Sequence, residues 1–142
     1  MFKKSIEKAR KYLNADALFT VVRNAFDKIP EFRSKDIKIS ISDALMSAFA
    51  IFSLKDPSLL QFDQRRKEEV ECQNLKNIYG IENIPSDSRM REICDEIEAN
   101  KYLGPIFKVL FRPLQRGKVL EQMVFYQGYY ILNLDGTYFF FL

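Results

Sequence analysis

The residues of this chain that are best suited to chemistry lie near its end, where one carboxylate follows an apolar run. Residues 129–137 read YYILNLDGT, and the carboxylate is Asp135. An apolar run of this length after Gly128 is typical of a strand covered on both faces, although a buried helix segment gives the same pattern. Because strand side chains alternate, Asp135 would share one face with Asn133. On the residues alone, Asp-Gly after such a run is more typical of a turn.

The chain resembles one protein family in this stretch and in several stretches upstream of it. Over residues 40–137 the chain resembles the N-terminal part of insertion-sequence transposases of the DDE superfamily, through SDALMSAFAIFSL, LLQFDQRR, NLKNIYGIENIPSDSRMREICDEI, LFRPLQRGKVLEQ and LDGT. In that family the Asp of the LDGT-like strand is the first of three acidic residues in an RNase H-like domain. The resemblance therefore implies that Asp135 is a catalytic residue and a ligand of Mg2+, where two divalent cations drive in-line phosphoryl transfer.

The end of the chain departs from this family pattern. The second Asp and the Glu of the family have no counterpart up to residue 142, and residues 138–142 read YFFFL where the family usually has small and polar residues. Because one carboxylate cannot hold two metal ions, Mg2+ is not expected to bind this chain tightly. The resemblance implies a truncated transposase that has lost catalysis, with an exposed apolar tail that favours aggregation.

Composition limits the other functions that are open to the chain. It contains no histidine and two cysteines, which excludes zinc fingers, histidine-based acid–base catalysis and Ser-His-Asp triads. Cys72 and Cys94 are expected to be partly buried free thiols. The net charge of +3, from 22 basic and 19 acidic residues, is compatible with nucleic-acid binding but is too small to indicate it. No stretch is apolar enough to cross a bilayer, so we expect a cytoplasmic, DNA-associated protein.

The apolar spacing predicts a mainly α-helical fold. Residues 1–117 are expected to form a helical region of the DNA-binding type. Residues 118–142 are expected to form a β-hairpin with its turn at Gln127-Gly128, which is the start of a truncated RNase H-like α/β domain. Residues 43–54 are apolar nearly all round and are predicted to be the central helix of the core.

Cap residues predict where the helices begin and end. Asn14 is expected to be a helix cap, Ser42 is expected to cap the helix that follows it, and Gly80 is expected to stop a helix. Asp56 and Pro57 are expected to open a helix whose inward residues are Leu59, Leu60 and Phe62.

Residues 74–98 predict two successive helices joined by a glycine-containing turn, which resembles a helix-turn-helix. In that interpretation Ser86, Ser88, Arg89 and Arg91 lie at the start of the second helix, which would enter a major groove of double-stranded DNA. The connection is longer than the usual three or four residues, and the acidic residues further along would repel phosphates. Any bundle with two successive helices gives the same pattern.

A second candidate for DNA contact lies in the last predicted helix, which Pro105 is expected to open and Pro113 to kink. Lys108, Arg112 and Arg116 recur every four residues with no acidic residue between them, so they share one face. These cations would contact DNA phosphates, or they form a solvated face whose last charges complement the helix dipole. The residues favour neither interpretation over the other.

Three functions follow from these patterns. The first is an insertion-sequence transposase that binds transposon-end DNA and has lost catalysis, as the family resemblance implies. The second is a small helical DNA-binding regulator. The third is an inactive helical fragment that associates only with itself or with a full-length transposase. None of the three involves a membrane partner.

Overall fold

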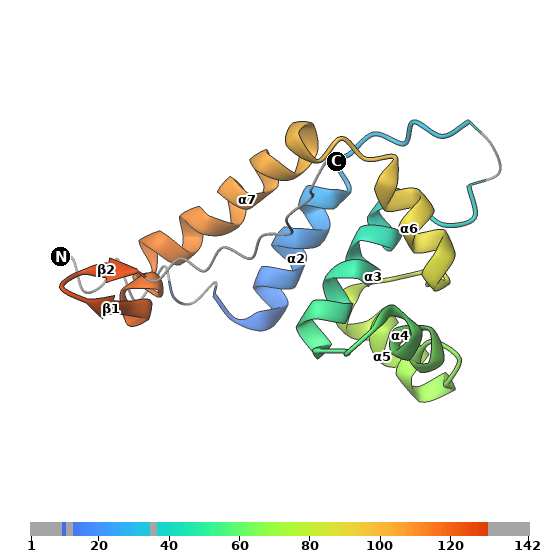
Figure 1. The fold of residues 1–142 in the computed structure, drawn as a ribbon, viewed down its shortest axis with the longest axis horizontal. Helices are drawn as coiled ribbons and strands as arrows, with labels where there is room; N and C mark the ends of the chain where they lie inside the picture. The colour runs from blue at the N-terminus through green and yellow to red at the C-terminus, as the bar shows by residue number, and fades with distance from the viewer. Residues whose placement is uncertain (1–9, 11–12, 35–36, 131–142) are drawn as a thin grey trace, which may run out of the picture.

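Six α-helices and a C-terminal β-hairpin make up the described part of the chain, residues 10, 13–34 and 37–130 of a computed structural model (Figure 1). This confirms the predicted mainly helical fold that ends in a hairpin. The helices are α2 (Ala15–Phe26), α3 (Ile41–Leu54), α4 (Leu59–Arg65), α5 (Glu69–Tyr79), α6 (Asp87–Asp95) and α7 (Ala99–Arg116). A short 3-10 helix, η1 (Leu120–Met123), leads to strands β1 (Val124–Tyr126) and β2 (Tyr129–Tyr130).

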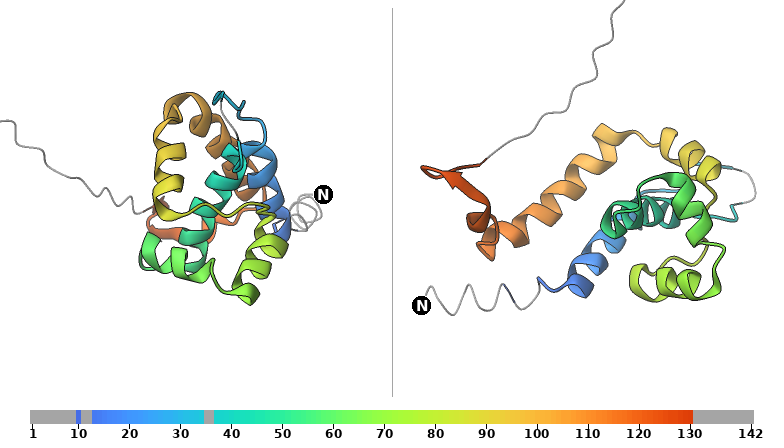
Figure 2. Two further views of the ribbon diagram at one scale, coloured as in Figure 1. Left: turned by 90° about the vertical axis from the view of Figure 1, so that its right-hand side faces the viewer. Right: turned by 60° about the horizontal axis from the view of Figure 1, so that its bottom comes forward.

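Helix α3 lies at the centre of the core, as its apolar composition predicts. All of its residues from Ile41 to Ser47 are buried. Helices α2, α5 and α6 pack against it, and α7 packs on α2. Figures 1 and 2 show that α7 and the hairpin extend to one side of the group formed by α3–α6. Helix α2 therefore lies between the core helix and α7.

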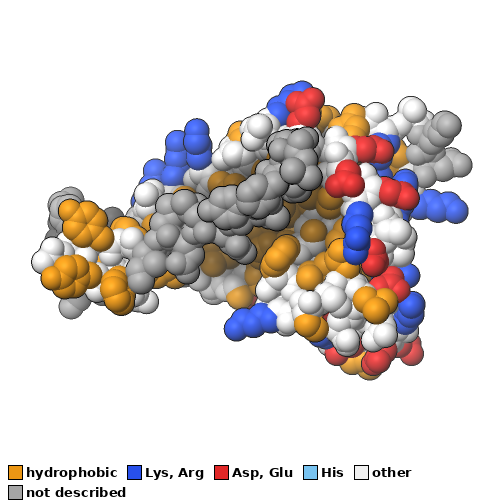
Figure 3. All heavy atoms as spheres, viewed as in Figure 1, with side chains coloured by type: hydrophobic (Ala, Val, Ile, Leu, Met, Phe, Trp, Pro, Cys, Tyr) orange, Lys and Arg blue, Asp and Glu red, His pale blue; other side chains and the backbone are white. Residues whose placement is uncertain are grey.

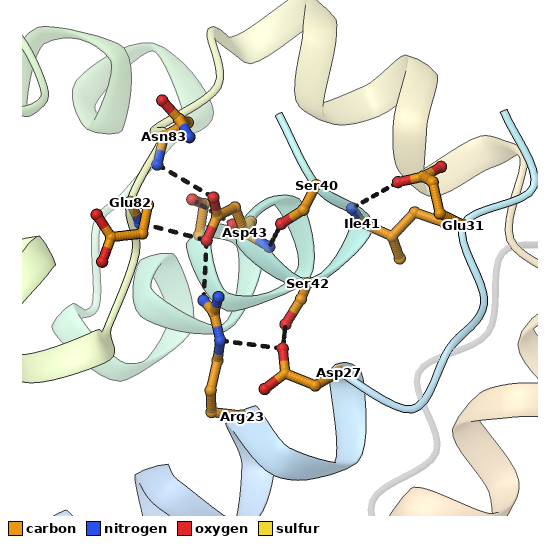
Figure 4. Close-up of polar contacts among 10 residues, drawn as sticks. Arg23, Asp27, Glu31, Ser40, Ile41, Ser42, Asp43, Glu82 and Asn83 are labelled. Carbon is orange, nitrogen blue, oxygen red and sulfur yellow. Dashed lines mark hydrogen bonds and ion pairs between the residues drawn. The ribbon is translucent and has the colours of Figure 1, made fainter. Parts of the chain in front are cut away.

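The carboxylate of Asp43, in the first turn of α3, joins three segments of the chain (Figure 4). The residue is 2% exposed. The Arg23 guanidinium on α2 donates from Nη1 to Oδ1 at 2.9 Å. The backbone N–H groups of Glu82 and Asn83, between α5 and α6, donate to the same carboxylate at 3.3 and 3.1 Å. A buried charge needs such partners, because burial without them costs several kcal/mol.

Helix α3 begins two residues before its predicted start, so the prediction that Ser42 caps it was wrong. Ser40 is the N-cap, and its hydroxyl oxygen accepts from the backbone N–H of Asp43 at 2.9 Å. Ser42 lies inside the first turn and donates to the carboxylate of Asp27. Both serines have the chemistry of a cap. They differ because the hydroxyl of Ser42 has another hydrogen-bond partner, the carboxylate of Asp27 at the end of α2.

The predicted opening of the next helix at Asp56 was also wrong. Ser58 is the N-cap of α4 and accepts from the backbone N–H of Gln61 at 3.2 Å. Asp56 instead accepts from Nη2 of Arg65 at 2.8 Å. Of the three residues expected inward, Phe62 is buried, Leu59 is partly buried and Leu60 is exposed.

Other predicted boundaries are confirmed. The Asn14 side chain caps α2 by accepting from the backbone N–H of Ala17 at 2.8 Å. Gly80 stops α5 in the left-handed conformation, with φ of 66°, which glycine adopts without a steric cost. Ser86 caps α6.

Helix α7 begins at Ala99, so the prediction that Pro105 opens it was wrong. Both Pro105 and Pro113 lie inside the helix, and each removes one backbone donor. Figure 1 shows α7 as one continuous helix through both prolines, and the kink at Pro113 stays a prediction. Helix α7 contacts α2, and Ile106 and Leu110 pack in the core, which supports the helix beyond Pro105.

The predicted hairpin turn at Gln127-Gly128 is confirmed. Both residues have positive φ, 48° and 86°, which is the geometry that matches the twist of two antiparallel strands. Strands β1 and β2 pair antiparallel with an irregularity in β1, so that Val124 lies opposite Tyr130. The expectation of a strand covered on both faces is wrong for its two described residues, because Tyr129 is 73% exposed and Tyr130 is 55% exposed. The described strands form a two-stranded sheet, in which neither face is covered.

The hydrogen bonds to Asp43 predict that replacing this residue strongly destabilises the fold. Asp43→Ala would leave Arg23 without its buried partner and two backbone N–H groups without an acceptor. We expect the free energy of unfolding to fall by about 2–3 kcal/mol, somewhat less than for a fully buried pair, because Arg23 also contacts Asp27. Urea unfolding followed by circular dichroism measures this loss.

A matched control is Glu92→Ala, which removes the acidic partner of an exposed ion pair with Arg89. This change should cost less than about 1 kcal/mol. Equal losses for the two variants would show that the Asp43 contacts do not organise the core.

Candidate nucleic-acid interface

The outer face of α7 carries three exposed cations without acidic neighbours on the helix. Lys108, Arg112 and Arg116 are all exposed, and the inner face buries Ile106. The sequence of α7 contains no Asp or Glu, unlike every other described helix. Within the described residues no ion pair involves any of the three cations. Figure 3 shows Lys and Arg side chains over the part of α7 that leads to the hairpin.

The predicted reading helix, α6, has a different charge pattern. Arg89 contacts Glu92 at 2.8 Å and Arg91 contacts Asp87 at 3.2 Å, so both arginines are partly neutralised on their own helix. The Ser86 hydroxyl is engaged as the cap and accepts from the backbone N–H of Arg89 at 3.4 Å. Ser88 is exposed. A helix with two arginines and three acidic residues presents little net attraction for phosphates.

The two groups of predicted DNA-binding residues are not brought together. Helix α6 packs against α3 and α4, whereas α7 packs against α2. Figures 1 and 2 show that α7 leads away from α6 toward the hairpin, so the cations at 108–116 lie at the end remote from α6. The segment between α5 and α6, residues 80–86, is longer than the three or four residues of a helix-turn-helix turn.

The charged run at residues 63–71 is divided between α4 and α5, and its cations are bound by carboxylates. Arg65 contacts Asp56 and Glu71, both at 2.8 Å, and these partners raise the pKa of its guanidinium. Lys67 and Arg66 both contact Asp63, at 2.8 and 2.7 Å, and their hydrogen bonds lower its pKa from 3.8 to about 2. These cations therefore stabilise the α4–α5 corner.

Exposed aromatic residues beside the α7 cations were not predicted as part of the site. Phe107 and Phe111 are 62% and 48% exposed. Each phenylalanine directly precedes a cation, Lys108 or Arg112, and the pair recurs after four residues. That repeat places the aromatic side chains beside the cations, and it is the signal in the sequence that identifies them.

The residues of the predicted metal site are outside the described part of the chain. Asp135 lies beyond residue 130, so its surroundings are not described. Among the described residues, no group of three or more His, Cys, Asp or Glu side chains is arranged to hold a metal ion. Cys72 and Cys94 are free and partly buried. Burial raises the pKa of the Cys94 thiol, which disfavours its reactive thiolate form.

No protein-family model matches this chain, and the comparisons with curated proteins and with solved structures found no match. Within the described residues, no helix combines the length and the apolarity that crossing a bilayer requires.

The contacts of Asp63 predict a specific response to acid. A carboxylate whose pKa is lowered by folding favours the folded state above its ordinary pKa of 3.8, and this contribution disappears as the pH falls toward about 2. We expect the NMR titration of Asp63 to give a pKa of about 2. Lys67→Ala should raise that pKa toward 3.8. An ordinary pKa for Asp63 in the unaltered chain would mean that these ion pairs do not persist in solution.

Proposed function

We propose that this chain binds double-stranded DNA through the outer face of α7, as the DNA-binding region of a transposase-like protein. The observation that carries the proposal is the set of Lys108, Arg112 and Arg116 on one exposed face of a helix without an acidic residue. Cations of this kind bind phosphates by releasing counterions from DNA, and an acidic neighbour would oppose that release.

The geometry of the cations suits a row of phosphates. Positions 108, 112 and 116 are each one helical turn apart, which is about 6 Å along the helix axis. The whole row spans about 12 Å, and duplex DNA carries one charge per about 1.7 Å of its axis, so several phosphates lie within reach of the row. Backbone contacts of this type position a protein on DNA without reading its sequence.

The charges favour α7 over α6 as the surface that binds DNA. Arg89 and Arg91 would have to leave Glu92 and Asp87 before they could contact phosphates fully. The three α7 cations have no such competition from their own helix. A small DNA-binding regulator that reads sequence with α6 is therefore the less favoured function.

The transposase part of the proposal depends on the resemblance at the LDGT stretch. That resemblance implies that Asp135 is a catalytic residue and a ligand of Mg2+, together with two further carboxylates of the family pattern. Mg2+ would activate a water molecule or a DNA 3′-hydroxyl when bound.

Replacing all three cations tests the proposal. In a chain carrying Lys108→Ala, Arg112→Ala and Arg116→Ala, the slope of log K against log salt concentration should decrease in magnitude by about 2.7, because three phosphate contacts are lost. Fluorescence anisotropy with a duplex of about 20 base pairs, titrated between about 50 and 200 mM salt, measures the slope.

The control chain carries Arg89→Ala and Arg91→Ala, which removes two exposed arginines from α6. Its salt slope should stay within error of the unaltered chain. The proposal fails if the unaltered chain does not bind duplex, if the triple variant keeps the full slope, or if the control loses as much.

A further inference from the structure

An open cavity of about 520 Å3 lies between the C-terminal end of α7 and the hairpin. Its apolar walls come from Phe111 on α7, from Leu120 and Met123 of η1, and from Tyr130 on β2. Gln115 adds one amide, which can both donate and accept a hydrogen bond. This combination of flat rings with a single neutral polar group is typical of a small-ligand site.

The charges that line the cavity leave its interior neutral. Lys118 and Glu121 both line it, and they pair with each other at 2.8 Å. The unpaired charges lie just outside, because Arg112 and Arg116 directly follow Phe111 and Gln115 in α7. Successive residues of a helix are about 100° apart around its axis, so the cation row adjoins the face that forms the cavity. One ligand can therefore contact both surfaces.

The hairpin holds Tyr130 opposite α7. The two-residue turn at Gln127-Gly128 reverses the chain, and pairing with Val124 fixes Tyr130 in the sheet. Figure 3 shows hydrophobic side chains gathered at the hairpin end of the molecule. With 48% of Phe111 and 55% of Tyr130 exposed, both rings are open to a planar partner.

We infer that this cavity binds an unpaired base of single-stranded DNA, which stacks on Phe111 and Tyr130 while Arg112 and Arg116 hold the adjacent phosphates. The inference rests on the proposed function and narrows it to DNA that has a single-stranded part. Bases within a duplex are stacked on each other and cannot enter the cavity, whereas unpaired bases stack readily on aromatic side chains.

The spacing of the aromatic residues also suits an extended strand. Phe107 and Phe111 are one helical turn apart, which is about 6 Å along the helix axis. Stacked nucleotides rise only about 3.4 Å each within one strand. A strand that followed the α7 cations would therefore have its bases separated from each other, and a separated base gains from a protein ring what it loses in stacking with its neighbour.

The test compares three labelled probes of equal length, about 15 nucleotides, near the upper end of known single-strand site sizes. The probes are a thymidine strand, a blunt duplex and a uridine strand of RNA, each titrated with the full chain by anisotropy. We expect the thymidine strand to bind about tenfold more tightly than the duplex and more tightly than the RNA. Phe111→Leu and Tyr130→Leu should each weaken binding of the thymidine strand about tenfold, and should weaken binding of the duplex much less.

Two matched variants control for general loss of aromatic surface. Phe107→Leu removes an exposed ring of α7 that does not line the cavity. It should weaken binding of the thymidine strand less than Phe111→Leu does. Tyr130→Phe keeps the ring and should bind normally. Circular dichroism of each variant checks that the helical content is unchanged.

The outcomes separate this inference from the proposed function. Duplex binding that depends on the α7 cations, without a preference for the thymidine strand, would overturn the inference and leave the proposed function standing. Thymidine binding that Phe111→Leu and Tyr130→Leu do not weaken, or RNA binding as tight as DNA binding, would overturn the inference as well. A chain that binds none of the probes would overturn both.

Discussion

The buried carboxylate of Asp43 is the interaction on which the rest of the structure depends. A carboxylate that is only 2% exposed is stable in its charged form only when hydrogen-bond donors contact its oxygens. Arg23 and the backbone N–H groups of Glu82 and Asn83 supply them. Apolar contacts hold α2 and α5 against α3 without fixing how they are turned, because the hydrophobic effect has no direction. The hydrogen bonds to Asp43 do have a direction, and they fix where α2 and the segment between α5 and α6 lie.

Helix α2 carries that constraint on to α7. Helix α7 packs on α2 and buries Ile106, and helix geometry then places Lys108, Arg112 and Arg116 outward. Their availability has a separate cause, which is local composition. On α6, Glu92 lies three positions from Arg89 and Asp87 lies four positions from Arg91, and these carboxylates partly neutralise the two arginines. Helix α7 contains no acidic residue. Packing sets the direction of the cations, and the absence of acidic neighbours on their helix leaves them available to a ligand.

The sequence predicts those features that depend on neighbours in the chain. The cap at Asn14, the stop at Gly80 and the turn at Gln127-Gly128 are local in this sense, and all three are confirmed. The start of α3 was missed because Ser42 meets Asp27, fifteen residues away, and no local pattern contains that contact. Pro105 gives a similar case, since packing against α2 supports a helix through a residue that usually begins or breaks one.

The candidate site divides in the same way between local and long-range causes. Three cations at a spacing of four are visible in the sequence, whereas the cavity that Phe111 and Tyr130 line together appears only in the folded structure. Phe111 and Tyr130 contribute little to the core, so substitutions there should leave the fold largely intact. Asp43 is the opposite case. A variant of Asp43 that loses DNA binding would not identify a DNA contact, because the orientation of α7 depends on α2, and α2 on Asp43. Only changes on the outer face of α7 and in the adjoining cavity separate binding from folding.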